Sequence, residues 1–286
     1  MVTKNSNLSL YLRIISYSVL AFTLAFLINN VLTVWSDWPG IKKIFSHHEM
    51  FGYKKKALEG SDLNYGYMQI GLYLICIAAV VFYVFKTYSQ TLEQDSKILS
   101  RFSAYLVRSS FWAVFLVGVA DFVISFMVVE RLWEAIFSPE VKALMVKAPV
   151  RITYIHFPII LISFVIGYFT KSVGFIWLAV LVVVSEFVIV LSRFIFSYEQ
   201  AFQGDLVRFW YAALYLFASA YALIHEGHVR VDVLYSSFSE KKKAWTNMVG
   251  SAVLGVPLTL IVIFLGLNGK ASIINGPVVA FEVTQQ

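Results

Sequence analysis

Charged residues, cysteine and catalytic motifs are all scarce in this sequence. Only 14% of its 286 residues are charged and Cys76 is its single cysteine, whereas 59% are hydrophobic. A soluble domain of this length could not bury so much apolar side chain. A single cysteine excludes disulfides, CxxC redox chemistry and cysteine-based metal sites. We therefore expect an all-α integral membrane protein without a metal or cofactor.

The motifs of an enzyme are absent as well. The sequence has no nucleophile elbow, phosphate loop, HExxH string or paired-carboxylate motif. Haem would need axial histidines on facing helices, and only His156 lies well within an apolar stretch. The net charge of +6 does not indicate nucleic-acid binding, because the basic residues are spread over many connectors instead of forming one stripe.

Long stretches with little or no charge recur along the chain. A membrane-spanning helix needs about twenty apolar residues, and the sequence predicts about seven such helices with short interfacial helices between them. The predicted spans are residues 14–36, 63–85, 109–129, 152–170, 172–192, 209–224 and 244–269. The sixth is short, and an amphipathic helical approach from Phe202 to Arg208 supplies its missing turn. Pro257 in the last span is tolerated as a kink.

One connector carries a helix-start signal. Ser138-Pro139-Glu140 offers a capping hydroxyl, a proline in the first turn and an acid near the positive end of the helix dipole. We predict that a short interfacial helix follows, with Val141, Leu144 and Met145 as its apolar residues.

Two predicted spans contain an acid. Ionisable groups within a membrane are costly and often functional. Asp121 has Ser125 four residues later and could meet His156 across the bundle, whereas Glu186 lies two turns before Arg193 and could join it only through a third group. Buried hydrogen-bonded pairing is the favoured interpretation of both acids, and direct proton or sodium coupling is the alternative.

The connector before the last span holds the string Gly227-His228-Val229-Arg230-Val231-Asp232. In an extended segment, His228, Arg230 and Asp232 would share one face and the valines would take the other. This alternation fits a non-helical clamp wedged against other protein, or a solvated loop whose charges meet lipid headgroups. The run Lys241 to Lys243 anchors the last span to anionic lipid and favours a cytoplasmic N-terminus, although Lys54 to Lys56 argue the other way.

These residues resemble the small, DctQ-type membrane subunit of tripartite ATP-independent periplasmic (TRAP) transporters. The resemblance covers about residues 174–270, and the family's glycine followed by His-Val-Arg-Val-Asp stands intact at 227–232. Arg193-Phe194 resembles the arginine–aromatic pair that ends the family's first span, and Phe209-Trp210 the aromatic start of its second.

The resemblance also implies a division of the chain. The family core has four spans, so residues 1–171 would be an N-terminal four-span extension and residues 172–286 a small-permease core with three spans. Because the chain stops near the place where the fourth core span would begin, we expect that the sequence is truncated.

The resemblance implies an auxiliary scaffold subunit of a sodium-driven transporter that imports organic acids or similar small anions. Its partners would be a large multi-span permease subunit, a periplasmic substrate-binding protein and membrane lipid, and its location the bacterial inner membrane. The intact string then favours the clamp. Substrate and ion sites in such systems lie in the large subunit, so no catalytic residue or substrate ligand is expected here. A free-standing secondary transporter or channel is the alternative.

Overall fold

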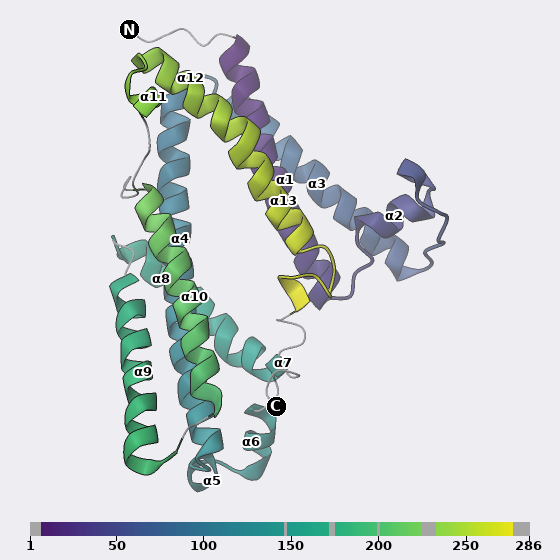
Figure 1. The fold of residues 1–286 in the computed structure, drawn as a ribbon. Helices are drawn as coiled ribbons and strands as arrows, with labels where there is room; N and C mark the ends of the chain where they lie inside the picture. Colours follow the sequence, from purple (N-terminus) through teal and green to yellow (C-terminus); the bar gives the residue numbers. More distant parts are fainter. Residues whose placement is uncertain (1–6, 146–147, 172–174, 199–200, 225–232, 277–286) are drawn as a thin grey trace. The chain divides into compact units, whose positions relative to one another are not determined.

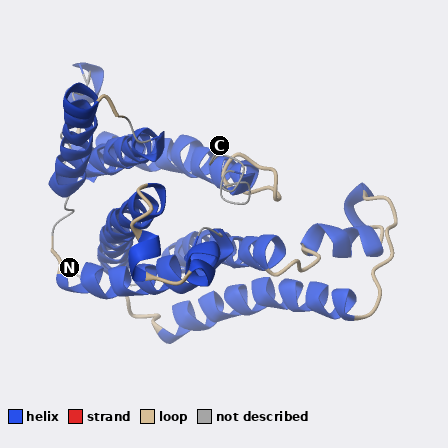
Figure 2. Cartoon of the chain, turned by 90° about the horizontal axis from the view of Figure 1, so that it is seen from below, coloured by secondary structure: helices blue, strands red, loops and turns tan. Residues whose placement is uncertain are grey.

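The computed structural model describes residues 7–145, 148–171, 175–198, 201–224 and 233–276, and none of these residues is in a β-strand (Figure 2). The expected all-α fold is confirmed. The described residues form two compact units. The terminal unit holds the residues up to Ser96 together with those from Val233 onward, and the central unit holds those from Lys97 to Ile224.

The terminal unit is built on two long helices, α1 (Asn7–Trp35) and α3 (Ser61–Lys86), which pack against each other. It also contains the first turn of α4 (Leu92–Val129). The last long helical run of the chain lies against α1 in this unit (Figure 1). The other helices of the unit are α2 (Ile41–His47), η1 (Met50–Gly52), α11 (Val233–Ser236), α12 (Glu240–Gly250), η3 (Ser251–Gly255) and α13 (Val256–Gly266).

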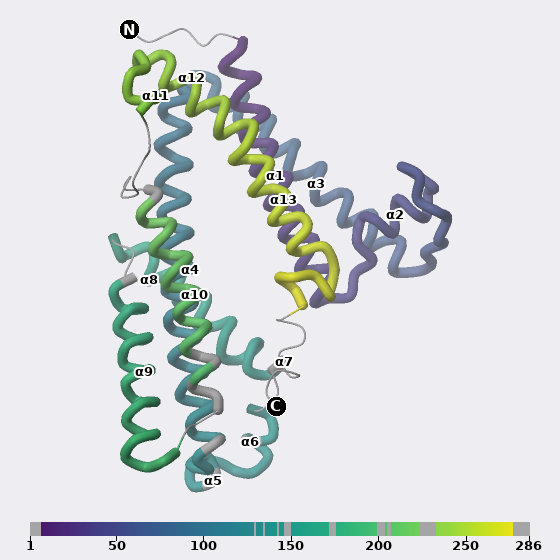
Figure 3. Tube along the Cα trace, in the orientation of Figure 1, coloured from purple at the N-terminus to yellow at the C-terminus, as the bar shows by residue number. Residues whose placement is uncertain are grey.

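The central unit contains the remainder of α4, and other helices of the unit pack around that helix. The antiparallel pair α9 (Phe175–Phe196) and α10 (Ala201–Ile224) packs together, and its trace can be followed in Figure 3. The buried core joins this pair to α4 through Phe111, Leu178, Val182, Ile189, Val207, Trp210 and Ala213. The shorter helices of the unit are α5 (Trp133–Ile136), α6 (Pro139–Met145), α7 (Ala148–Arg151), η2 (Ile152–His156) and α8 (Phe157–Phe169).

Six helical segments among the described residues are long and apolar enough to cross a membrane. They correspond to the predicted spans other than 209–224. That stretch forms part of α10, which begins at Ala201 and so includes the predicted helical approach. The short helix predicted after Ser138 is present as α6, and its interfacial position stays a prediction.

The structure differs from the sequence prediction in the length of α4. The predicted spans 63–85 and 109–129 leave residues 86–108 as a connector, but most of these residues extend α4 into a helix of 38 residues. A reciprocal capping box starts this helix, because the Gln94 amide N–H donates to Thr91 Oγ1 at 3.3 Å and the Thr91 amide N–H donates to Gln94 Oε1 at 2.9 Å. Charged residues on one side of a helix do not end it when a cap and good helix formers support it.

Two helices contain a π-helical turn immediately before a proline. The segment η2 precedes Pro158 in α8, and η3 precedes Pro257 in α13. A proline ring clashes with the carbonyl of residue i−4, which is Tyr154 or Val253 and lies within the π-helical turn in both cases. The wider turn therefore accommodates each proline while the helical run continues.

Close helix contacts in the central unit depend on glycine. A Cβ atom on Gly118 of α4 would lie 2.0 Å from Trp210 Nε1 of α10, and one on Gly167 of α8 would lie 2.9 Å from the backbone of Ser109 in α4. Small residues allow such approaches between membrane helices. Gly118 thus admits the indole of Trp210, which is 1% exposed.

Candidate functional site

The string at Gly227–Asp232 lies outside the described residues, so the predicted clamp stays a prediction. The helices that follow it are described. Asn247 Nδ2 of α12 donates to the Tyr235 hydroxyl of α11 at 2.8 Å, and Lys243 Nζ lies 6.0 Å from the centroid of the Tyr235 ring. These contacts fix α11 against α12 directly after the string. Lys241 to Lys243 lie in α12, whose helical run continues to Gly266.

Asp121 of α4 lies in a buried polar cluster of the central unit. Its Oδ1 atom is 2.9 Å from His156 Nε2 and 3.4 Å from Arg151 Nη1. The same Arg151 nitrogen lies 3.5 Å from Ser125 Oγ, one helical turn after Asp121. The side chains of Arg151 and Asp121 are only 4% and 13% exposed. The cluster therefore provides hydrogen-bonding and charge partners for an acid that lies within a span.

The π-helical turn explains how both basic residues reach one oxygen atom. Arg151 ends α7 and His156 ends η2, five residues later. In an α-helix, five residues correspond to about 500° of rotation, which would separate the two side chains by about 140° around the axis. A π-helix bonds residue i to residue i+5, so residues five apart come close to one face. The turn required by Pro158 thus also aligns Arg151 and His156.

This geometry favours structural pairing. A buried carboxylate that has both a guanidinium and an imidazole beside it is compensated within the chain. No group of three or more histidine, cysteine, aspartate or glutamate side chains among the described residues could hold a metal ion. The sequence indicates Asp121, Ser125 and His156 as members of this cluster but not Arg151, because a basic residue just before a span normally extends to the lipid headgroups.

Glu186 and Arg193 are not brought together. Both side chains are exposed on α9, and no ion pair or hydrogen bond joins Glu186 to another described residue. Glu186 instead lines a hollow of about 520 Å³ between α9 and α10, together with Arg208 and Tyr215. The two acids within predicted spans therefore have opposite environments, one buried and paired and the other exposed.

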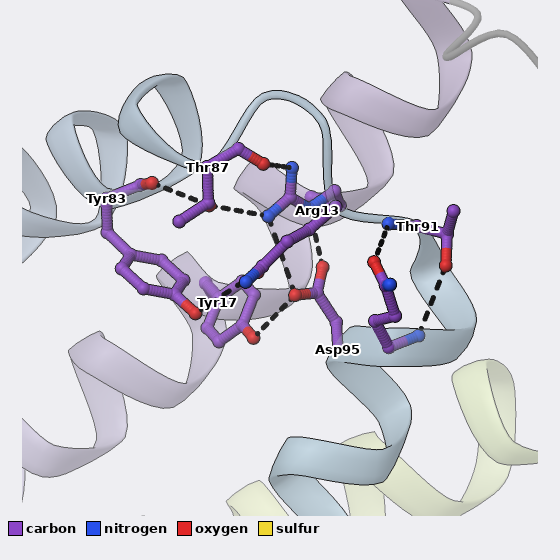
Figure 4. Close-up of polar contacts among 8 residues, drawn as sticks. Arg13, Tyr17, Tyr83, Thr87, Thr91 and Asp95 are labelled. Carbon is purple, nitrogen blue, oxygen red and sulfur yellow. Dashed lines mark hydrogen bonds and ion pairs between the residues drawn. The ribbon is translucent and has the colours of Figure 1, made fainter.

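A second buried ion pair lies in the terminal unit (Figure 4). Arg13 of α1 donates from Nε to Asp95 Oδ2 at 2.5 Å, and from Nη1 and Nη2 to the carbonyl and hydroxyl oxygens of Thr87 at 2.9 and 2.8 Å. The Tyr17 hydroxyl donates to Asp95 Oδ1 at 3.2 Å. Arg13 is 2% and Asp95 4% exposed. The pair ties α1 to the turn between α3 and α4.

The sequence pattern did not predict this pair. Arg13 directly precedes a predicted span and Asp95 lies in the polar sequence between two predicted spans, and charged residues are common in both places. A useful signal would have been the capping residue Thr91, because it starts a helix that brings Asp95 into its first turn.

Outside the spans, an exposed ion pair links two loops of the terminal unit. Lys270 Nζ donates to Asp37, which follows α1, and this hydrogen bond lowers the pKa of the Asp37 carboxyl below its ordinary value. The Asn275 side chain also reaches α1, where its amide and that of Asn30 each donate to the other's oxygen at 3.2 Å.

The helices and their buried ion pairs define an all-helical, multi-pass membrane protein. Residues 179–280 match the sequence model of the family described as tripartite ATP-independent periplasmic transporters, DctQ component. This match supports the DctQ-type resemblance for that segment of the chain. Comparisons with curated proteins and with solved structures give no match. The matched segment includes Glu186 and the string at 227–232, whereas the Asp121 cluster and the Arg13–Asp95 pair lie before it.

Proposed function

We propose that this protein is the small auxiliary subunit of a sodium-driven TRAP transporter in the bacterial inner membrane, with its N-terminus in the cytoplasm. It holds a large multi-span permease subunit in the membrane, and a periplasmic binding protein delivers an organic acid or a similar small anion to that permease. The observation that carries the proposal is the DctQ match over residues 179–280, which contains the intact string at 227–232.

The polar side chains support a scaffold role. The buried acids Asp95 and Asp121 are paired with Arg13 and Arg151 of the same chain. Paired groups of this kind define how helices pack and leave no acceptor for a substrate or a travelling ion. We therefore assign the substrate and ion sites to the large permease.

Reconstitution tests the proposal. The chain is co-expressed with the large permease of the same organism, the complex is purified through a tag on the chain, and uptake of candidate organic acids is measured in proteoliposomes under a sodium gradient. We expect copurification, and uptake only when both subunits and the binding protein are present. Uptake by this chain alone would favour a free-standing transporter or channel. A permease that is fully active without the chain would exclude the scaffold role.

A further inference from the structure

Glu186 lies at the middle of an apolar helix. It follows the first residue of α9, Phe175, by eleven positions and precedes the last, Phe196, by ten. At about 1.5 Å per residue, Glu186 is roughly 15 Å from either end of the helix, which is half the thickness of a hydrocarbon core. Helix α9 is long and apolar enough to span the membrane. The carboxyl group therefore lies near the bilayer centre.

No hydrogen bond or ion pair from the described part of the chain compensates the charge of Glu186. The side chain is exposed, and none of the described residues pairs with it. Arg208 lines the same hollow, but no ion pair joins it to Glu186. An ionisable group at the centre of a membrane helix is costly on insertion scales. Lipid cannot offset that cost, because acyl chains offer no hydrogen-bond donor.

The hollow beside Glu186 can receive another helix. Its volume is about 520 Å³, and its remaining walls come from α10: Val207, Tyr211, Ala212, Tyr215 and Leu216. Tyr211 and Tyr215 are 63% and 70% exposed. Ala212 is a small residue in the same lining, so a neighbouring helix can approach closely at that point. The lining is mostly apolar, although it includes Arg208, and its one acid has no hydrogen bond or ion pair with another described residue. Such a surface suits an apolar helix that carries one donor.

We propose that a transmembrane helix of the large permease subunit packs across this α9–α10 face and places a cationic or hydrogen-bond-donating side chain against Glu186. This inference rests on the proposed function, which supplies the partner. The charge of Glu186 specifies the chemistry of the contact, and its depth places the contact near the bilayer centre. The opposite side of α9, marked by Val184, faces lipid.

Site-specific photo-crosslinking in the co-expressed complex locates the contact. A benzoylphenylalanine replaces Tyr215 in the hollow, and in the control it replaces Val184, which lies 200° around α9 from Glu186. We expect a covalent adduct with the permease from position 215 and none from position 184. An adduct from position 184 alone, or an adduct from position 215 with a second copy of this chain, would overturn the proposal.

Two substitutions test the contribution of the acid. Glu186→Leu should reduce the amount of permease that copurifies by at least about tenfold, since truncating one partner of a buried charged hydrogen bond speeds dissociation. Glu186→Gln keeps a hydrogen-bond acceptor, so the amount of copurifying permease should fall less. Purified without the permease, the Glu186→Leu chain should be at least as thermally stable as the original, which separates weakened docking from misfolding.

The two proposals fail in distinguishable ways. If the unmodified chain does not copurify with the permease, the proposed function is wrong. If it does copurify but Glu186→Leu copurifies equally well, the auxiliary role stands and the α9–α10 face is not the docking surface.

Discussion

Phe264 of α13 packs edge-on against Phe26 of α1, with 4.6 Å between the ring centroids. The first residue belongs to the DctQ-matched segment and the second to the long stretch that precedes it. A corresponding contact occurs in the central unit, where Trp210 of α10 lies against Gly118 of α4. In both units, the N-terminal residues thus pack directly on the matched helices.

The compact units do not follow the predicted division of the chain into residues 1–171 and 172–286. The compact units divide at Ser96 and between α10 and α11, so each contains part of the predicted extension and part of the predicted core. The boundary at residues 171 and 172 stays a prediction about the family core. We infer that the extension stabilises the matched helices, since each unit would expose buried aromatic surface without it.

Gly118→Leu should destabilise the central unit. A side chain at this position would enter the space of the Trp210 ring, and overpacking costs about 1–3 kcal/mol. The measurement is the thermal unfolding midpoint in detergent. Gly204→Ala is the matched control, because a Cβ atom there meets nothing within 4 Å, so its midpoint should be unchanged or higher. Equal losses for both variants would contradict the assigned contact.

Asp121→Leu should lower stability by about 3–5 kcal/mol, because it removes a carboxylate that pairs with buried Arg151. Adding Arg151→Leu to the same chain should restore most of the lost stability. Chemical unfolding in mixed micelles measures both effects. The control is Glu240→Leu, which breaks an exposed pair with Lys243 and should cost under about 1 kcal/mol. A double variant no more stable than Asp121→Leu would exclude a specific pair.

The sequence predicted the helices better than the side-chain pairs. Absence of charge located the spans, and Ser138-Pro139-Glu140 located α6, because both signals are local. The partners of Asp121 and Asp95 depend on helix rotation, which periodicity alone does not fix. Arg151 reaches Asp121 only through the π-helical turn before Pro158. Two ionisable residues five positions apart, just before a proline in a span, are therefore a sequence signal for a cluster of this kind.

Asp121→Asn should leave the sodium dependence of the reconstituted complex unchanged. The side chain keeps its place beside His156 and Arg151, and the proposed ion sites lie in the permease. Glu186→Gln should behave in the same way once uptake is normalised to the amount of assembled complex. The measurement is initial uptake rate against sodium concentration and pH. A shifted sodium or pH profile in either variant would assign that acid to ion coupling.

Arg13→Lys should weaken the attachment of α1 to the turn between α3 and α4. Arg13 uses three nitrogens to reach Asp95 and both oxygens of Thr87, whereas a lysine ammonium is a compact donor that cannot span them. Hydrogen exchange should rise around residues 86–92 and at the start of α1. Arg101→Lys is the control, because exposed Arg101 donates from Nε to the Lys97 carbonyl of its own helix at 3.3 Å. Its exchange pattern should match the original chain, and unchanged exchange in Arg13→Lys would show that charge alone, without the guanidinium geometry, maintains this junction.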